Sequence, residues 1–273
     1  MNPIIEDLQL VGEYRGFEQY YPRTRDREDI AVLKSSVNDL IILDKDPGID
    51  YSAQPAFEPS ATYEDITRRK KRIASYFHGQ SYLDIGAANG NMLKSCAEIF
   101  DIVEGVEPNR EMAKHIPFMT YDSVEELELD KYSMVTMYHV LEHVPNPIEF
   151  LSRVRESMST GGILIIEVPH AKDALLTYYD LEEFKAFTFW SQHLILYTRD
   201  VLCKILREAG FTSETTFGDQ RYNLSNHMYW LKERKPGGQY KFRMRAPQLE
   251  SKYTLWLEGK DMTDTIVAIG VKK

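Results

Sequence analysis

Strands and helices alternate in the pattern of the chain between residues 81 and 211, and this alternation limits the fold more than any other feature. Apolar stretches of strand length are each followed by a segment with the apolar spacing of a helix. The alternation predicts a parallel sheet with helices on both faces, because each helix returns the chain to the start of the next parallel strand. The expected strands are 81–86, 102–108, 117–122, the start of 132–143, and 161–170, and the expected helices are 91–100, 109–116, 123–129, 146–158 and 198–211.

Residues at both ends extend this α/β core. Apolar runs at 30–34 and 40–44 flank turn residues, which predicts a hairpin within an N-terminal extension over 1–58. The main domain is expected over 59–273, with a helical insertion at about 220–260. The last residues, 263–273, predict one more strand, placed antiparallel at the edge of the sheet.

Charge and composition exclude several classes of protein. The net charge of −9 disfavours nucleic acid as a partner, because phosphates must be neutralised by basic patches. The basic run RRKKR at 68–72 is interpreted as a solvated helix face. Cys96 and Cys203 offer neither a disulfide framework nor zinc spacing, as expected of a cytoplasmic protein. The first residues lack the pattern of a signal peptide, and no apolar run reaches the roughly 18 residues of a membrane span.

Acidic residues stand where successive strands end, at the edge where such sheets bind ligands. Asp84 precedes a turn of small residues at 86–90, and its carboxylate would repel a pyrophosphate but attract a cation or an ammonium group. The turn also lacks the G-x-G-x-x-G spacing of a dinucleotide site. Glu107 can accept the hydroxyls of a ribose, and Asp122 with the Ser123 backbone can bind an adenine. This combination suits S-adenosylmethionine, which carries an amine, a ribose, an adenine and a sulfonium without phosphate.

The same segments resemble the ordered motifs of class I S-adenosylmethionine-dependent methyltransferases, over about residues 60–215. The motifs are YLDIGAANG, GVEPN, YDS and MVTMYHVLEHVPNP. The resemblance implies a Rossmann-like fold with a mostly parallel seven-stranded sheet, S-adenosylmethionine as cofactor, S-adenosylhomocysteine as product, and no metal. Ala88 stands where many members have glycine, and cofactor binding is expected to survive the added methyl group. The residues implied to bind the cofactor are Asp84, Gly86, Ala88, Gly90, Glu107, Pro108, Asp122, Ser123, Tyr138 and His139.

Three further segments resemble a branch of this family that is found with surface-polysaccharide and sugar biosynthesis and with ubiquinone-type O-methylation. They are HVLEHVPNP, GGILIIEVPH and HLILYTRDVLCKILREAGF. The resemblance implies methyl transfer to a small molecule, a hydroxyl of a sugar or phosphorylated sugar-like intermediate of capsule or O-antigen synthesis. The alternatives are a ubiquinone-type or other small-molecule O- or N-methyltransferase, and a cofactor-binding subunit without catalysis. A homodimer is compatible with each of these functions.

Two histidines are candidates for a general base, the usual role of this side chain in proton transfer. His193 follows the fifth strand and a loop over 170–192 that is expected to cover the site. Related sugar C-methyltransferases carry a glutamate beside a similar histidine, and Gln192 in its place argues against a carbon-acid mechanism. His139, at the end of the fourth strand, is the second candidate.

The segment QRYNLSNHMYW at 220–230 could contribute an acceptor pocket. Its candidate residues are Arg221, Tyr222, Asn226 and His227. An arginine there would suit a phosphate or carboxylate on the substrate. The competing interpretation is an ordinary amphipathic helix that packs Met228, Trp230 and Leu231 inward.

Overall fold

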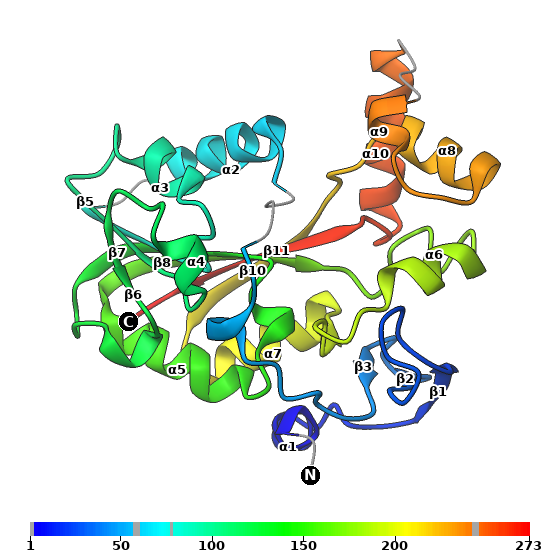
Figure 1. Ribbon diagram of the computed structural model, residues 1–273, viewed down its shortest axis with the longest axis horizontal. Helices are drawn as coiled ribbons and strands as arrows, with labels where there is room; N and C mark the ends of the chain where they lie inside the picture. The colour runs from blue at the N-terminus through cyan, green and yellow to red at the C-terminus, as the bar shows by residue number, and fades with distance from the viewer. Residues whose placement is uncertain (1–2, 57–60, 77–78, 242–245) are drawn as a thin grey trace. The chain divides into compact units, whose positions relative to one another are not determined.

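The computed structural model describes residues 3–56, 61–76, 79–241 and 246–273 (Figure 1). The chain divides into two compact units, each assembled from three segments. The first unit contains residues 1–47, 168–202 and 216–267, and the second contains 48–167, 203–215 and 268–273. In the described part of the chain, no helix combines the length and the apolar character needed to cross a membrane.

A seven-stranded sheet has the strand order β10-β11-β8-β7-β4-β5-β6. The four pairings from β8 to β6 are all parallel, which confirms the predicted α/β fold. All five residues of β4 are buried, as expected of a strand covered on both faces. The strands are β4 (Ser81–Ile85), β5 (Ile102–Val106), β6 (Met119–Tyr121), β7 (Tyr132–Tyr138), β8 (Met158–Pro169), β10 (Thr212–Asp219) and β11 (Thr265–Val271).

The position of the last strand differs from its prediction. β11 lies between β8 and β10, not at the edge of the sheet. Its pairing is antiparallel as expected, because Lys272 N donates to Gly162 O while His170 N donates to Asp264 O. The physical reason is that six of its seven residues are buried, which suits an interior strand. The more polar strand β10 forms the edge instead.

Helical segments precede the first parallel strand and connect the strands that follow it. α2 (Tyr63–Ser75) begins with a capping box in which Thr62 and Asp65 bond reciprocally. α5 (Pro147–Ser157) starts with the predicted proline in its first turn. The other helical segments here are α3 (Asn91–Cys96), α4 (Arg110–Ala113), α7 (Arg199–Glu208) and the short 3-10 turns η1 (Tyr51–Ala53), η2 (Val124–Glu126) and η3 (Leu141–His143).

The first unit has a four-stranded sheet in the order β1-β2-β3-β9. The predicted hairpin is present, since β2 (Val32–Ser35) and β3 (Ile41–Leu43) pair antiparallel. The two-residue strand β9 (Ile195–Leu196) also pairs with β3, although it is distant in sequence. The remaining elements are β1 (Phe17–Tyr21), α1 (Pro3–Leu10), α6 (Glu182–Thr188), α8 (Leu224–Glu233), α9 (Gly238–Lys241) and α10 (Pro247–Gly259).

Candidate functional site

The turn after β4 depends on left-handed backbone conformations. Gly86, Ala88 and Gly90 have φ of 75°, 50° and 73°. A Cβ atom on Gly86 would overlap the Val140 side chain, so only glycine fits that position. The Gly86 and Ala87 N–H groups donate to Val106 O at 2.8 and 3.0 Å, which holds the turn against the end of β5. The result is a turn with little side-chain bulk at the carboxyl edge of the sheet.

Asp84 lies at the end of β4 and is almost completely buried, with 3% of its surface exposed. Its carboxylate accepts a hydrogen bond from the Thr136 hydroxyl at 2.7 Å, and that hydroxyl lies 2.7 Å from the Tyr82 hydroxyl. Burial raises the pKa of Asp84 to about 7, and the nearby charge of Glu107 adds to the increase. A cationic group bound beside Asp84 would favour its ionised form.

Glu107 joins the turn to the loop that follows β5. One carboxylate oxygen accepts from Ala88 N at 2.7 Å, and the other accepts from Asn109 N at 2.8 Å. Burial raises the pKa of Glu107, against the effect of these two hydrogen bonds. Each carboxylate oxygen has a second lone pair, so Glu107 can still accept hydroxyl groups of a ligand.

The other predicted cofactor residues lie along the same edge. Pro108 and Ser123 are partly buried, and Asp122 is exposed just beyond β6. The Glu107 N–H donates to Tyr121 O at 3.0 Å, which ties the ends of β5 and β6 together. The structure therefore places acidic side chains at the ends of three adjacent strands.

Tyr138 is the last residue of β7, and His139 follows it. The Tyr138 hydroxyl is buried and has no hydrogen-bond partner among the described residues. His139 has a left-handed backbone, with φ of 58°, and its N–H donates to Glu167 O at 2.8 Å. Its ring Nδ1 lies 3.2 Å from Glu142 Oε1, and its Nε2 lies 3.5 Å from Glu167 Oε1. Both ring nitrogens therefore face carboxylate oxygens.

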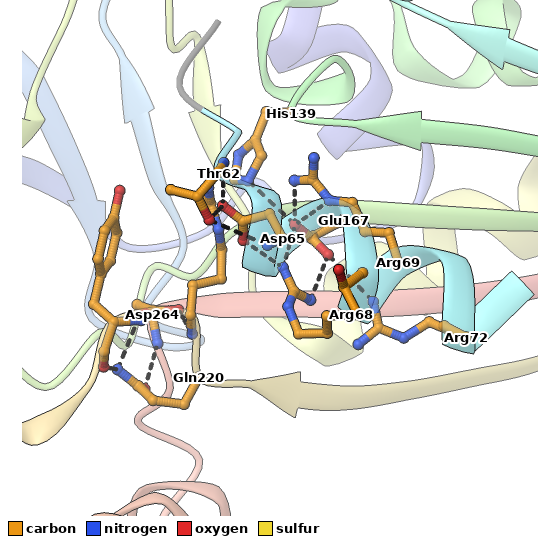
Figure 2. Close-up of polar contacts among 12 residues, drawn as sticks. Thr62, Asp65, Arg68, Arg69, Arg72, His139, Glu167, Gln220 and Asp264 are labelled. Carbon is orange, nitrogen blue, oxygen red and sulfur yellow. Dashed lines mark hydrogen bonds and ion pairs between the residues drawn. The ribbon is translucent and has the colours of Figure 1, made fainter. Parts of the chain in front are cut away.

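Glu167, near the end of β8, is fully buried among arginines of α2 (Figure 2). Its Oε1 contacts Arg69 Nη2 at 2.5 Å, and its Oε2 contacts Arg68 Nη1 at 2.9 Å and Arg72 Nη1 at 3.2 Å. Burial alone would raise the pKa of Glu167, but His139, Arg69 and Arg68 outweigh it and hold that pKa well below its ordinary value.

The interpretation of the run 68–72 as a solvated helix face is therefore wrong. Three of its five side chains point to a buried carboxylate, because a charge inside the protein must be paired. Lys70 does fit the original interpretation, since its partner Glu98 is exposed.

The predicted base His193 belongs to the first unit. It lies just before β9 and is partly buried, with its ring edge-on to Trp190 at 5.5 Å between centroids. Its N–H donates to Trp190 O at 2.9 Å. Its catalytic role stays a prediction.

Three of the four candidate acceptor residues belong to one hydrogen-bond network in the first unit, because Gln220 bonds Asp264 and its Nε2 also lies 3.3 Å from His227 Nε2. The Arg221 and Tyr222 N–H groups donate to Asp264, whose carboxylate also accepts from Gln220 (Figure 2). His227 is buried, which lowers its pKa to about 4, and its Nδ1 lies 2.7 Å from the Tyr253 hydroxyl. Asn226 is also buried.

The competing helix interpretation is correct for Trp230, which is buried, but wrong for Met228, which is 40% exposed. The ring of Trp230 packs against Phe184 and Phe187, with ring centroids 5.0 and 5.3 Å apart.

Sequence reasoning missed several residues that shape these sites. They are Tyr82, Asn109, Thr136 and Glu167. Glu167 had a usable signal, because a single acidic residue in an otherwise apolar strand needs a buried cation. Thr136 and Tyr82 had none, since hydroxyl-bearing residues are ordinary in strands.

Comparison with known proteins decides the family. Residues 59–216 match a family model described as a methyltransferase domain. The chain belongs to this methyltransferase family. It is a methyltransferase that uses S-adenosylmethionine as its methyl donor, in agreement with the expectation from the strand-end motifs.

Solved structures support the fold. A SAM-dependent methyltransferase from Archaeoglobus fulgidus aligns with a TM-score of 0.52 at 19% identity, over 76% of this chain and 94% of that one. Phosphoethanolamine N-methyltransferase 2 from Haemonchus contortus aligns with a TM-score of 0.54 at 20% identity, over 82% of this chain and 55% of that one. At these identities the similarity shows the fold alone. No curated protein sequence matches the methyltransferase.

Proposed function

We propose that this methyltransferase acts on a hydroxyl of a sugar or sugar-like intermediate in capsule or O-antigen polysaccharide biosynthesis. The main support for binding of the methyl donor is the pair of buried acids, Asp84 and Glu107, which lie on either side of the left-handed turn. The acceptor is supported by the resemblance of segments 139–147, 161–170 and 193–211 to the sugar-associated branch.

The residues at the carboxyl edge fit an adenosyl cofactor. Gly86 leaves room where a Cβ would collide with Val140. Asp84 is a buried acid suited to a cationic partner, and Glu107 retains lone pairs for ribose hydroxyls. When bound, the cofactor supplies an electrophilic methyl group with its own leaving group. The protein then mainly has to hold the acceptor in line, and positioning of this kind is worth about 7–11 kcal/mol.

His193 is the proposed general base. Of the two histidine candidates, His139 has both ring nitrogens turned to carboxylate oxygens, so it is better suited to positioning than to accepting a proton. A base contributes about 10²- to 10⁴-fold to such reactions. Arg221, Tyr222, Asn226 and His227 stay proposed as acceptor-side residues.

The acceptor is tested with labelled S-adenosylmethionine and a panel of nucleotide sugars, quinone precursors and phosphorylated amines. Label in a sugar supports the proposal. Label only in a quinone precursor or an amine moves the function to an alternative. Cofactor binding without turnover on any acceptor favours a non-catalytic subunit.

The base is tested with His193→Ala, which should lower turnover at least tenfold and leave the affinity for S-adenosylhomocysteine unchanged. His115→Ala is the control, because His115 is exposed and lies in the turn after α4. Equal turnover in His193→Ala and wild type would remove His193 from the reaction.

We further propose that the methyltransferase is cytoplasmic and can form a homodimer. The absence of a disulfide framework in the sequence supports a reducing compartment. Light scattering after gel filtration measures the mass in solution, and a monomeric mass at micromolar concentration would contradict the dimer.

A further inference from the structure

The segment 51–55, between the N-terminal hairpin and α2, contacts two separate loops of the second unit. At one end, the Tyr51 hydroxyl lies 3.1 Å from His143 Nδ1, and the two rings meet edge to face at 5.7 Å. At the other end, the Asn109 side-chain amide donates to Gln54 O at 3.0 Å and approaches Pro55 O at 3.5 Å. The segment is thus held at two points.

These two points lie on either side of the cofactor turn. His143 belongs to the loop after β7, and Asn109 belongs to the loop after β5. In the sheet, β4 lies between β7 and β5, and the turn with Gly86 and Gly90 follows β4. A segment bonded to both flanking loops therefore crosses the carboxyl edge above the end of β4.

Asn109 connects this segment to the ribose-side acid. Its N–H donates to Glu107 Oε1 at 2.8 Å, its side-chain oxygen accepts from Glu111 N and Met112 N to cap α4, and its amide nitrogen reaches the 51–55 segment. Asn109 is 3% exposed. One buried side chain therefore links Glu107, α4 and the crossing segment.

We propose that residues 51–55 form a wall of the cofactor site and that Asn109 is the positioning residue that holds them there. The proposal rests on donor binding at Asp84 and Glu107. The wall would retain an adenosyl compound and slow its release. No residue of η1 is buried, so the segment can open locally without disturbing the sheet.

The test measures the dissociation rate of S-adenosylhomocysteine by surface plasmon resonance. Asn109→Ser keeps a side-chain oxygen that can cap α4 but removes the amide that holds the segment. It should raise the dissociation rate about fivefold or more, because two hydrogen bonds are lost. Tyr51→Phe keeps the ring, loses the hydroxyl contact and should raise the rate about two- to fivefold.

Tyr63→Phe is the matched control for Tyr51→Phe, since Tyr63 is 81% exposed and lies on α2, outside the 51–55 segment. Its dissociation rate should equal that of the wild type. If Asn109→Ser and Tyr51→Phe also release the product at the wild-type rate, the inference is overturned while the proposed function survives. If Asn109→Ser lowers the thermal midpoint of unfolding, the dissociation rate of Tyr51→Phe decides alone. A wild-type rate in Tyr51→Phe then overturns the inference. A wild type that does not bind the product at all would instead defeat cofactor use.

Discussion

At the scale of single residues, the proposed cofactor edge contains two features that lower the stability of the folded protein. Asp84 is a buried carboxyl whose pKa is raised from 3.8 to about 7, so its ionisation in the folded protein is unfavourable. Ala88 adopts a left-handed conformation that favours glycine. Asp84 at the end of β4 and Ala88 in the following turn both belong to the proposed cofactor site, where strained or destabilised groups are expected to gather.

Replacing Asp84 by Asn should stabilise the protein without ligand. The folded pKa lies above the unfolded value, so the wild type loses stability as the pH rises from about 4 to about 7. At pH 8 the variant should be more stable by up to about 4 kcal/mol, because the folded protein raises the pKa of Asp84 from 3.8 to about 7 and each pKa unit corresponds to about 1.4 kcal/mol. Urea unfolding at pH 8 and pH 5 measures this gain, which should shrink at the lower pH.

The same variant should bind S-adenosylmethionine at least tenfold more weakly, since it lacks the charge opposite the cation. The exposed Asp122 serves as the stability control, and Asp122→Asn should unfold like the wild type at both pH values. A stability gain for Asp84→Asn that does not depend on pH would contradict the burial argument.

Replacing Ala88 by Gly should relieve backbone strain. The left-handed conformation costs an L-residue about 1–2 kcal/mol, and the greater freedom of glycine in the unfolded chain offsets part of the gain. We expect a net stabilisation of about 0.5–1 kcal/mol in urea unfolding. The bond from the residue 88 N–H to Glu107 does not involve the side chain, so cofactor affinity should be retained. A destabilised variant would show that the methyl group packs usefully.

At the scale of elements, the second unit joins α2 to β8 through one buried ion cluster. Glu167 is fully buried, and Arg69 beside it is 3% exposed. The Arg69 guanidinium also lies over the Tyr138 ring at 4.3 Å, a cation–π contact. The sequence pattern predicts that the basic run 68–72 of α2 is exposed. In the structure, the arginines of that run hold α2 against β8.

Replacing Glu167 by Gln should destabilise the protein by about 3–5 kcal/mol, because three guanidinium groups lose their common partner. Chemical unfolding measures the loss. Lys70→Met is the control from the same basic run and should change stability by less than about 0.5 kcal/mol.

The pH dependence of this cluster is opposite in sign to that of Asp84. The folded pKa of Glu167 is lower than its ordinary 4.5, so its stabilisation is complete above about pH 4.5 and is lost as the pH falls through the folded value. If Glu167→Gln and Lys70→Met lowered the free energy of unfolding by similar amounts, the ion cluster would not be what anchors α2 to β8.

At the scale of the whole molecule, the donor and acceptor candidates belong to different compact units. All ten predicted cofactor residues lie in the second unit, between Asp84 and His139. His193 and the four predicted acceptor residues lie in the first. The predicted donor residues and the predicted acceptor residues are thus separated between the two units.

Hydrogen exchange with S-adenosylhomocysteine tests the division. The ligand at 100 times its Kd stabilises the form that binds it by about 2.7 kcal/mol. Protection should rise most in residues 84–90 and 106–109 and least in 220–233, because the proposed contacts lie in the second unit. Protection that is greatest in 220–233 would place the donor site elsewhere.

The sequence by itself determined the fold class, the turn after β4, the acids at the strand ends and the 32–43 hairpin. These features follow from local periodicity and turn chemistry, which neighbouring residues encode. Only the tertiary structure decided the inner place of β11, the pairing of Glu167 with α2, and the contact of Asn109 with residues 51–55. Those depend on which distant segments come together, and a buried charge or amide takes whichever partner the packing brings within bonding distance.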